Sequence, residues 1–175
     1  MAVGTKNSNI ITTLNSTIST TPDLAKTKGS IFVSSDTFEI VAEDVGDVND
    51  KIVLTRLRSS CRVYSIMIYS DELDTNGSPT LATDCGIYLT DGTVKDSDAF
   101  GSAVTTGWGD AAGAGVEFLT EAGATPVGNI SKQLWQLAGE SSDPGVEYDI
   151  ALKVTTAAAT GASGTLSFVI LFTDF

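Results

Sequence analysis

The chain has 175 residues, with 22 acidic against 10 basic side chains, a net charge of −12 and no histidine. This length is enough for one domain with its own core, and the negative charge repels nucleic-acid backbones and anionic membranes. Without histidine, the sequence lacks the usual general base and the commonest metal ligand, which argues against an enzyme. We therefore expect no nucleic acid, membrane or cofactor as a partner.

Residues 1–28 differ in composition from the rest, because 13 of them are Ser, Thr or Asn and their net charge is +2. The β-branched and Asn residues of this segment disfavour a helix, so we predict an extended N-terminal arm. The alternative is an ordinary disordered tail. As an arm, the segment would bind a neighbouring subunit through its scattered apolar residues, which are Ile10, Ile11, Leu14 and Ile18.

Strand-like segments follow the arm, and we predict that residues 29–175 form a single β-sandwich domain. In "SIFVSSDTFEIVAE" apolar residues alternate with polar ones, the period of half-buried strands, at Ile31, Val33, Phe38, Ile40 and Ala42. "KIVLTRLR" and "CRVYSIMIYS" come next, and the second is apolar on both faces, as expected in the middle of a sheet. "DCGIYLTDG" predicts a further strand closed by a turn.

The loop "DELDTNGS", residues 71–78, is the candidate metal site. Glu72, Asp74 and Asn76 copy ligand positions one, three and five of a helix-loop-helix calcium loop, in which oxygens converge on the ion. The twelfth position, which should supply a bidentate Glu, is Thr83, and the flanking segments resemble strands rather than helices. We therefore expect a plain solvated turn of Asp, Asn and Gly without a bound metal.

Residues 93–126 are rich in Gly and Ala and have weak periodicity, so we expect long loops with one or two short strands. The segment "NISKQLWQLAGESSDPG" predicts one short helix. Ser131 can cap this helix, apolar residues from Leu134 to Ala138 share one face, and Gly139 can end it.

The segments "VEYDIALKVTT" and "TLSFVILFTDF" show the most regular alternation and are joined by the loop "AAATGASG". We predict that they form a hairpin. Its inward side chains should be buried core, namely Tyr148, Ile150, Leu152, Leu166, Phe168 and Ile170. Many short strands with one short helix predict an all-β fold, an antiparallel β-sandwich with a jelly-roll connection.

A pair of carboxylates is the remaining candidate for chemistry. Glu147 and Asp149 share one strand face near Asp143, and glycoside hydrolysis needs two carboxyl groups facing each other across the substrate. The alternation, however, places that face opposite the core, where charged residues are expected to be solvated. We predict no catalytic residues.

Three arginines and two cysteines complete the candidate set. Arg56, Arg58 and Arg62 form the basic cluster of the body, which we expect to bind carboxylates of this chain or of a neighbouring one. Cys61 and Cys85 are too few for a disulfide framework and lack the spacing of a zinc site. We interpret them as two buried thiols, although one bridge between neighbouring strands would also fit.

The segment "KQLWQLAGESSDPGVEYDIALKVTTAAATGASGTLSFVILF" resembles small structural proteins of tailed bacteriophages, and "KGSIFVSSDTFEIVAEDVGDVNDKIVLTRL" is similar in style. This resemblance implies a capsid cement or decoration protein, a β-sandwich that sits on the outside of the shell, often as a trimer, and clamps neighbouring capsomers. It implies the major capsid protein as partner, assembly in the host cytoplasm and a place on the virion surface. It brings no catalytic residues and no cofactor.

The rival interpretation is a carbohydrate- or receptor-binding β-sandwich module of a phage tail or head fibre, since such modules present aromatic side chains to sugars. Trp108 lies in a Gly-rich loop and is the candidate platform, whereas Trp135 belongs to the predicted helix and is expected in the core. An enzyme is the third and weakest interpretation.

Overall fold

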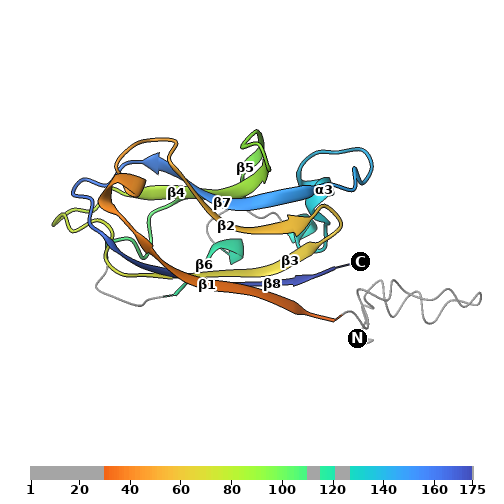
Figure 1. Ribbon diagram of the computed structural model, residues 1–175, viewed down its shortest axis with the longest axis horizontal. Coiled ribbons are helices and arrows are strands. Elements are labelled where there is room, and N and C mark those ends of the chain that lie inside the picture. The colour runs from red at the N-terminus through yellow and green to blue at the C-terminus, as the bar shows by residue number, and fades with distance from the viewer. Residues whose placement is uncertain (1–29, 110–114, 121–126, 175) are drawn as a thin grey trace, which may run out of the picture.

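The computed structural model describes residues 30–109, 115–120 and 127–174, which form two antiparallel sheets stacked face to face (Figure 1). One sheet has the order β1-β8-β3-β6, with β1 (Phe32–Ile40), β8 (Gly164–Thr173), β3 (Arg62–Ser70) and β6 (Val116–Glu117). The other has the order β2-β7-β4-β5, with β2 (Lys51–Arg58), β7 (Glu147–Thr156), β4 (Ala82–Leu89) and β5 (Val94–Val104). The short helical turns are η1 (Ala42–Val45), η2 (Phe118–Thr120), η3 (Val127–Asn129) and α3 (Leu134–Leu137). The predicted all-β sandwich is confirmed.

Most connections between consecutive strands cross from one sheet to the other. The β4–β5 connection stays within a sheet, whereas β1, β2 and β3 alternate between sheets, as do β5, β6, β7 and β8. The first strand pairs with the last over its whole length, from Phe32 opposite Phe172 to Ile40 opposite Gly164, and β2 pairs with β7. Because all pairs are antiparallel, connections that follow odd-numbered strands lie at one end of the sandwich and the others at the opposite end.

The predicted hairpin between β7 and β8 is wrong, because the two strands lie in different sheets. β7 pairs with β2 and β4, whereas β8 pairs with β1 and β3. Alternation reports which face of a strand is buried and not which strand is its partner, so two inward-facing runs also fit two facing sheets. The loop 157–163 crosses between the layers, held by backbone bonds to the β3–β4 loop such as Ala162 N–H to Leu73 O at 3.0 Å.

The predicted core positions of these two strands are nevertheless confirmed. All six side chains are at most 2 % exposed, namely Tyr148, Ile150, Leu152, Leu166, Phe168 and Ile170. They meet across the space between the sheets, where full burial of one such side chain contributes about 1.5–3 kcal/mol. The prediction that β3 is central is also confirmed, since it lies between β8 and β6.

The beginning of β1 is exposed, contrary to the prediction of a half-buried strand. Ile31 and Val33 are 64 % and 59 % exposed, whereas Ile40 is buried. Successive residues of a strand face opposite sides, so Val33 points away from the core that Ile40 and the partly buried Phe38 contact. Ala42 lies beyond the strand, in η1. β1 is also an edge strand, with β8 on one side.

The Gly- and Ala-rich stretch contains two strands, within the one or two expected, but β5 has 11 residues and is not short. Glycines allow close packing of β5 against its neighbours. A Cβ atom on Gly86 of β4 would lie 2.3 Å from the carbonyl oxygen of Asp96, and one on Gly101 would lie 2.5 Å from the Phe118 ring. Such a composition is typical of a loop, but here small residues let β5 lie tightly against its neighbours.

The predicted helix is confirmed as the single turn α3, which begins later than expected. Gln133 occupies the N-cap position and its N–H donates to the side-chain oxygen of Gln136 at 2.9 Å, so the cap is not Ser131. Gly139 ends the helix as predicted, with a φ of 78° that glycine adopts without steric cost. Among the described residues, no helix is long and apolar enough to cross a membrane.

Candidate functional site

The carboxylate of Asp74 is the centre of a buried hydrogen-bond network between the loops 71–81 and 157–163. Its side chain is fully buried, and the two oxygens accept hydrogen bonds from backbone N–H groups of both loops. The donors to Oδ2 are Thr80 at 2.7 Å, Leu81 at 3.0 Å and Ala159 at 3.0 Å, and those to Oδ1 are Thr160 at 3.0 Å and Asn76 at 3.3 Å. Asp74 therefore fastens the β3–β4 connection to the β7–β8 connection.

These donors also set the charge state of the carboxylate. Burial by itself raises the pKa of Asp74, but backbone hydrogen bonds outweigh it and lower the pKa to about 2. Asp74 is thus ionised at neutral pH although no Lys or Arg of the described residues forms an ion pair with it. The positive ends of five N–H dipoles face the oxygens that a metal ion would need, and this environment favours a structural anion over a calcium ligand.

The other candidate ligands of the loop do not turn towards a common point with Asp74. The Asn76 amide oxygen accepts a hydrogen bond from the Ser78 N–H at 3.0 Å, and its Nδ2 donates to Thr160 Oγ1 at 3.1 Å. Glu72 is partly exposed. Within the described ranges, no group of three or more His, Cys, Asp or Glu side chains is placed to hold a metal ion. The expectation that the loop binds no calcium stays a prediction.

The predicted arginine cluster is divided by its ion pairs. Arg56 forms a bidentate pair with Asp149 across β2 and β7, with Nε–Oδ1 at 2.6 Å and Nη2–Oδ2 at 3.0 Å. Arg58 lies 3.7 Å from the carboxylate of Asp174, and Arg62 is buried at the start of β3. Carboxylates of this chain thus occupy Arg56 and Arg58, one of the two arrangements expected, while their binding to another chain stays a prediction.

The three carboxylates considered for acid–base chemistry have separate structural surroundings. Asp149 is buried, contrary to the prediction that its face is solvated, because β7 is an inner strand and a guanidinium covers the carboxylate. Asp143 accepts hydrogen bonds from the Ser59 hydroxyl and from the Gly145 N–H, and so closes the turn before β7. Glu147 is exposed at the first position of that strand.

Trp108 is buried, contrary to its interpretation as an exposed sugar platform. It is 3 % exposed, its Nε1 donates to the Val104 carbonyl at 3.0 Å, and its ring centroid lies 6.2 Å from that of Phe118. The rival function thereby loses its candidate residue. Trp135 packs against the core and is partly buried, as predicted.

Both cysteines are free and buried, which confirms the interpretation as thiols. Burial raises the pKa of Cys61 to about 11, and it raises the pKa of Cys85 even further. Because a thiolate is the reactive form of cysteine, both side chains are poor nucleophiles at neutral pH.

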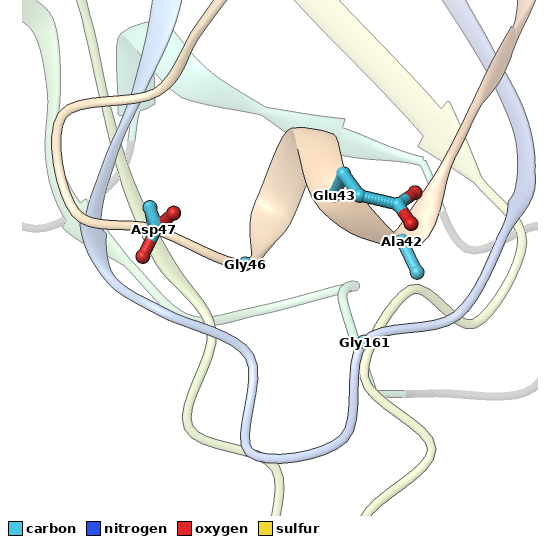
Figure 2. Close-up of a pocket in the computed structure, with 5 residues that line it drawn as sticks. All are labelled: Ala42, Glu43, Gly46, Asp47 and Gly161. Carbon is cyan, nitrogen blue, oxygen red and sulfur yellow. The ribbon is translucent and has the colours of Figure 1, made fainter.

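A hollow of about 330 Å³ opens between η1 and the β7–β8 loop (Figure 2). It is lined by Ala42, Glu43, Gly46, Asp47 and Gly161. Figure 2 shows Glu43 and Asp47 on opposite sides of the η1 turn rather than facing each other. These five residues offer two carboxylates and include no cation, hydroxyl or aromatic ring.

The described loops at one end of the sandwich carry seven carboxylates and no Lys or Arg. We call this the acidic end and define it by the loops 41–50, 71–81, 105–109 and 157–163. Its carboxylates are Glu43, Asp44, Asp47, Asp50, Asp71, Glu72 and Asp74. At the opposite end, which we call the α3 end, β1 begins, β8 ends and α3 lies beside the β2–β3 turn, on the right of Figure 1.

Sequence reasoning missed both this segregation of charge and the exposed beginning of β1. The signal for the first was present, because connections that follow odd-numbered strands share one end of an antiparallel sandwich. "AEDVGDVND" and "DELD" follow the first and third strands, so their carboxylates could have been placed together. The predicted arm residues Ile10, Ile11, Leu14 and Ile18 lie outside the described residues.

No family model matches the chain, and no curated protein matches it. Chains from two phage capsids are among the solved structures that are similar to it. A chain of the capsid asymmetric unit of cyanophage Pam1 is 19 % identical with a TM-score of 0.54, over 84 % of this chain and 86 % of that one. A chain from the capsid of Ralstonia phage GP4 is 22 % identical with a TM-score of 0.57, over 82 % of this chain and 85 % of that one. At these identities the likeness shows a shared fold.

Proposed function

We propose that this chain is a bacteriophage virion structural protein, a cement or decoration protein that binds the outside of the capsid shell. The observation that carries the proposal is the likeness of the sandwich to chains from two phage capsids. Each alignment covers nearly equal shares of both chains, so those capsid chains are of about this size and are not larger proteins with one similar domain. The sequence resemblance to phage cement proteins points the same way.

A jelly-roll connection is part of this proposal. The first strand pairs with the last, β2 with β7, β3 with β6, and β4 with β5. An eight-stranded ribbon that is folded at its middle and wrapped into two sheets has these four pairs, and it is the pattern expected of a jelly roll. The pairing leaves β1 and β2 as edge strands on the same side of the sandwich.

The partner that we propose is the major capsid protein, and the chain would stabilise contacts between its neighbouring subunits. Extended, the arm of residues 1–28 can span up to about 90 Å, enough to reach from one shell subunit to the next. Its apolar residues Ile10, Ile11, Leu14 and Ile18 would anchor it. The arm loses conformational entropy when it becomes ordered on binding, and burial of these side chains would compensate for that loss. A homotrimer on the virion surface, assembled in the host cytoplasm, is the arrangement that the resemblance implies.

The experiment that tests this function removes the arm. Deletion of residues 1–28 should leave the circular dichroism spectrum and melting temperature of the sandwich unchanged, because its core lies within the described strands. The same deletion should abolish stable association with shells that lack the protein, measured by co-sedimentation. Binding of the full chain should weaken as salt rises, since the arm carries +2 against a strongly acidic body.

A full-length control keeps the length and charge of the arm, with Ile10, Ile11, Leu14 and Ile18 all changed to Ser. If these apolar residues are the anchors, the control binds as poorly as the deletion. Truncated protein that decorates shells with undiminished affinity would show that the arm is an ordinary tail.

A further inference from the structure

The α3 end of the sandwich exposes an apolar surface around the beginning of β1. Ile31, Phe32 and Val33 follow one another and are 64 %, 47 % and 59 % exposed. Phe32 and Val33 face opposite sides of the strand, and the Phe32 ring lies 5.9 Å from that of the partly buried Phe172 on β8. Three consecutive large apolar residues at a free strand edge are a feature that soluble proteins normally cover or replace with charge.

Two further exposed apolar side chains lie at the same end, on the segment that surrounds α3. Ile130 is 47 % and Val146 is 39 % exposed. The segment is attached to the β2–β3 turn by backbone hydrogen bonds, from Leu134 N–H to Cys61 O at 2.9 Å and from Ser59 N–H to Val146 O at 2.8 Å. The α3 end is therefore a coherent part of the fold, and its apolar side chains are held in place by it.

The opposite, acidic end has the character of a surface that stays in water. Six of its seven carboxylates are not buried, Asp74 being the exception, and the same loops carry no Lys or Arg. Desolvation of several unpaired carboxylates in an interface is strongly unfavourable. The exposed Val41 and Val48 of this end are separate from each other, and Val48 follows Asp47. The described segments of the α3 end carry fewer carboxylates together with Lys132, namely Asp91, Glu140, Asp143 and Asp174. The two ends thus differ in the surface that they offer to a partner.

We propose that the molecule docks end-on, with the α3 end against an apolar protein surface of the shell and the acidic end directed into solvent. This inference rests on the proposed function and adds the contact surface and the orientation. The chain outside the described part supports the choice of occupant, because residues 1–29 join the sandwich directly before Ile31. An arm that is anchored in the shell therefore enters it beside this apolar surface, and both contacts fall on the same partner.

The shell surface that fits is apolar at its centre, to receive Phe32 and its neighbours, and acidic around it, to complement the arm and the exposed guanidinium of Arg58. A second copy of this chain is the other occupant to consider. The test below separates the two, because a second copy would cover the α3 end in the isolated protein as well.

Cysteine footprinting tests the orientation, since the native thiols are buried and stay unreactive towards maleimide. Three exposed valines of similar accessibility serve as reporters, each changed to Cys in an otherwise unaltered full chain. Val33→Cys reports on the α3 end, Val48→Cys on the acidic end and Val53→Cys on the outer face of β2. Melting temperatures confirm that each variant folds, and maleimide–biotin labelling rates are compared for the free protein and for protein bound to purified shells.

All three variants should label at similar rates in the free protein. On shells, Val33→Cys should label many-fold more slowly, whereas Val48→Cys and Val53→Cys should keep their free rates. A bound protein in which Val33→Cys stays reactive, or in which Val48→Cys is protected instead, would overturn the end-on docking while leaving the cement function intact. Protection of Val33→Cys before shells are added would overturn it in favour of self-association, and failure to co-sediment with shells would contradict the proposed function itself.

Discussion

Asp74 shows how one side chain can fix the connections of a whole sandwich. Its buried carboxylate accepts five backbone N–H groups from two loops that join different pairs of strands. The change Asp74→Ala leaves those donors without a partner, so we expect the free energy of unfolding to fall by about 3 kcal/mol or more. Urea denaturation followed by tryptophan fluorescence measures this loss.

Glu72→Ala, in the same loop, is the matched control and should change the free energy of unfolding by no more than about 0.5 kcal/mol. Acid titration gives a second readout. Folding lowers the pKa of Asp74 from 3.8 to about 2. The ionised carboxylate therefore contributes fully to the free energy of unfolding above pH 4, and this contribution is lost as pH falls towards 2. The Asp74→Ala protein should lack this part of the acid dependence, and an identical acid profile for both proteins would contradict the role of Asp74.

Predictions for single residues succeeded where a residue type has one strongly preferred environment or backbone conformation. The free cysteines are buried, and Gly139 ends its helix in the left-handed region. It was wrong for Trp108 and Asp149, because a composition or an alternation does not show that another element covers the residue. Asp74 was expected in a solvated turn but is buried, because two of its five donors come from a loop about 85 positions later in the chain, which a local pattern cannot reveal.

At the level of elements, the strands were predictable and their partners were not. β2, β3, β4, β7 and β8 stand where β-branched and alternating runs predict them, because burial of one face is recorded in the sequence. Partner choice depends on contacts between distant strands and on the lengths of loops, so the expected β7–β8 hairpin was replaced by two facing sheets. β5 is longer than the short strand expected there, because its small residues serve close packing and resemble loop composition.

Close contact of β4 with β5 gives a prediction at this level. Gly86→Ala places a methyl group 2.3 Å from the backbone of Asp96 and Ser97, and a paired strand cannot move aside as a flexible side chain would. We expect a loss of about 1–3 kcal/mol in the free energy of unfolding, seen as a lower melting temperature in calorimetry.

Gly77→Ala is the control, since nothing lies within 4 Å of the added carbon. It should be neutral or stabilise by up to about 1 kcal/mol through the unfolded chain. Equal melting temperatures for the two variants would show that the β4–β5 packing described here is not tight.

At the level of the molecule, the fold class was predictable because it follows from many short alternating runs. The distribution of charge over the surface depends instead on which loops the strand topology brings together. Acidic segments such as 43–50 and 71–74 are separate in the sequence and meet at one end because the strands alternate in direction. The apolar α3 end arises similarly, where the start of the first strand meets the end of the last. The molecule thus has one end whose described loops carry carboxylates without Lys or Arg, and another that exposes apolar side chains beside carboxylates such as Asp143 and Asp174.

A quantitative mass-spectrometric inventory of purified virions tests the proposed structural role on the phage capsid. The inventory measures the number of copies of this chain relative to the major capsid protein. A cement protein that occupies equivalent sites over the whole shell should be present at a copy number of the same order as the shell subunits. Complete absence from particles, or a handful of copies as expected for a tail tip or fibre, would contradict the account.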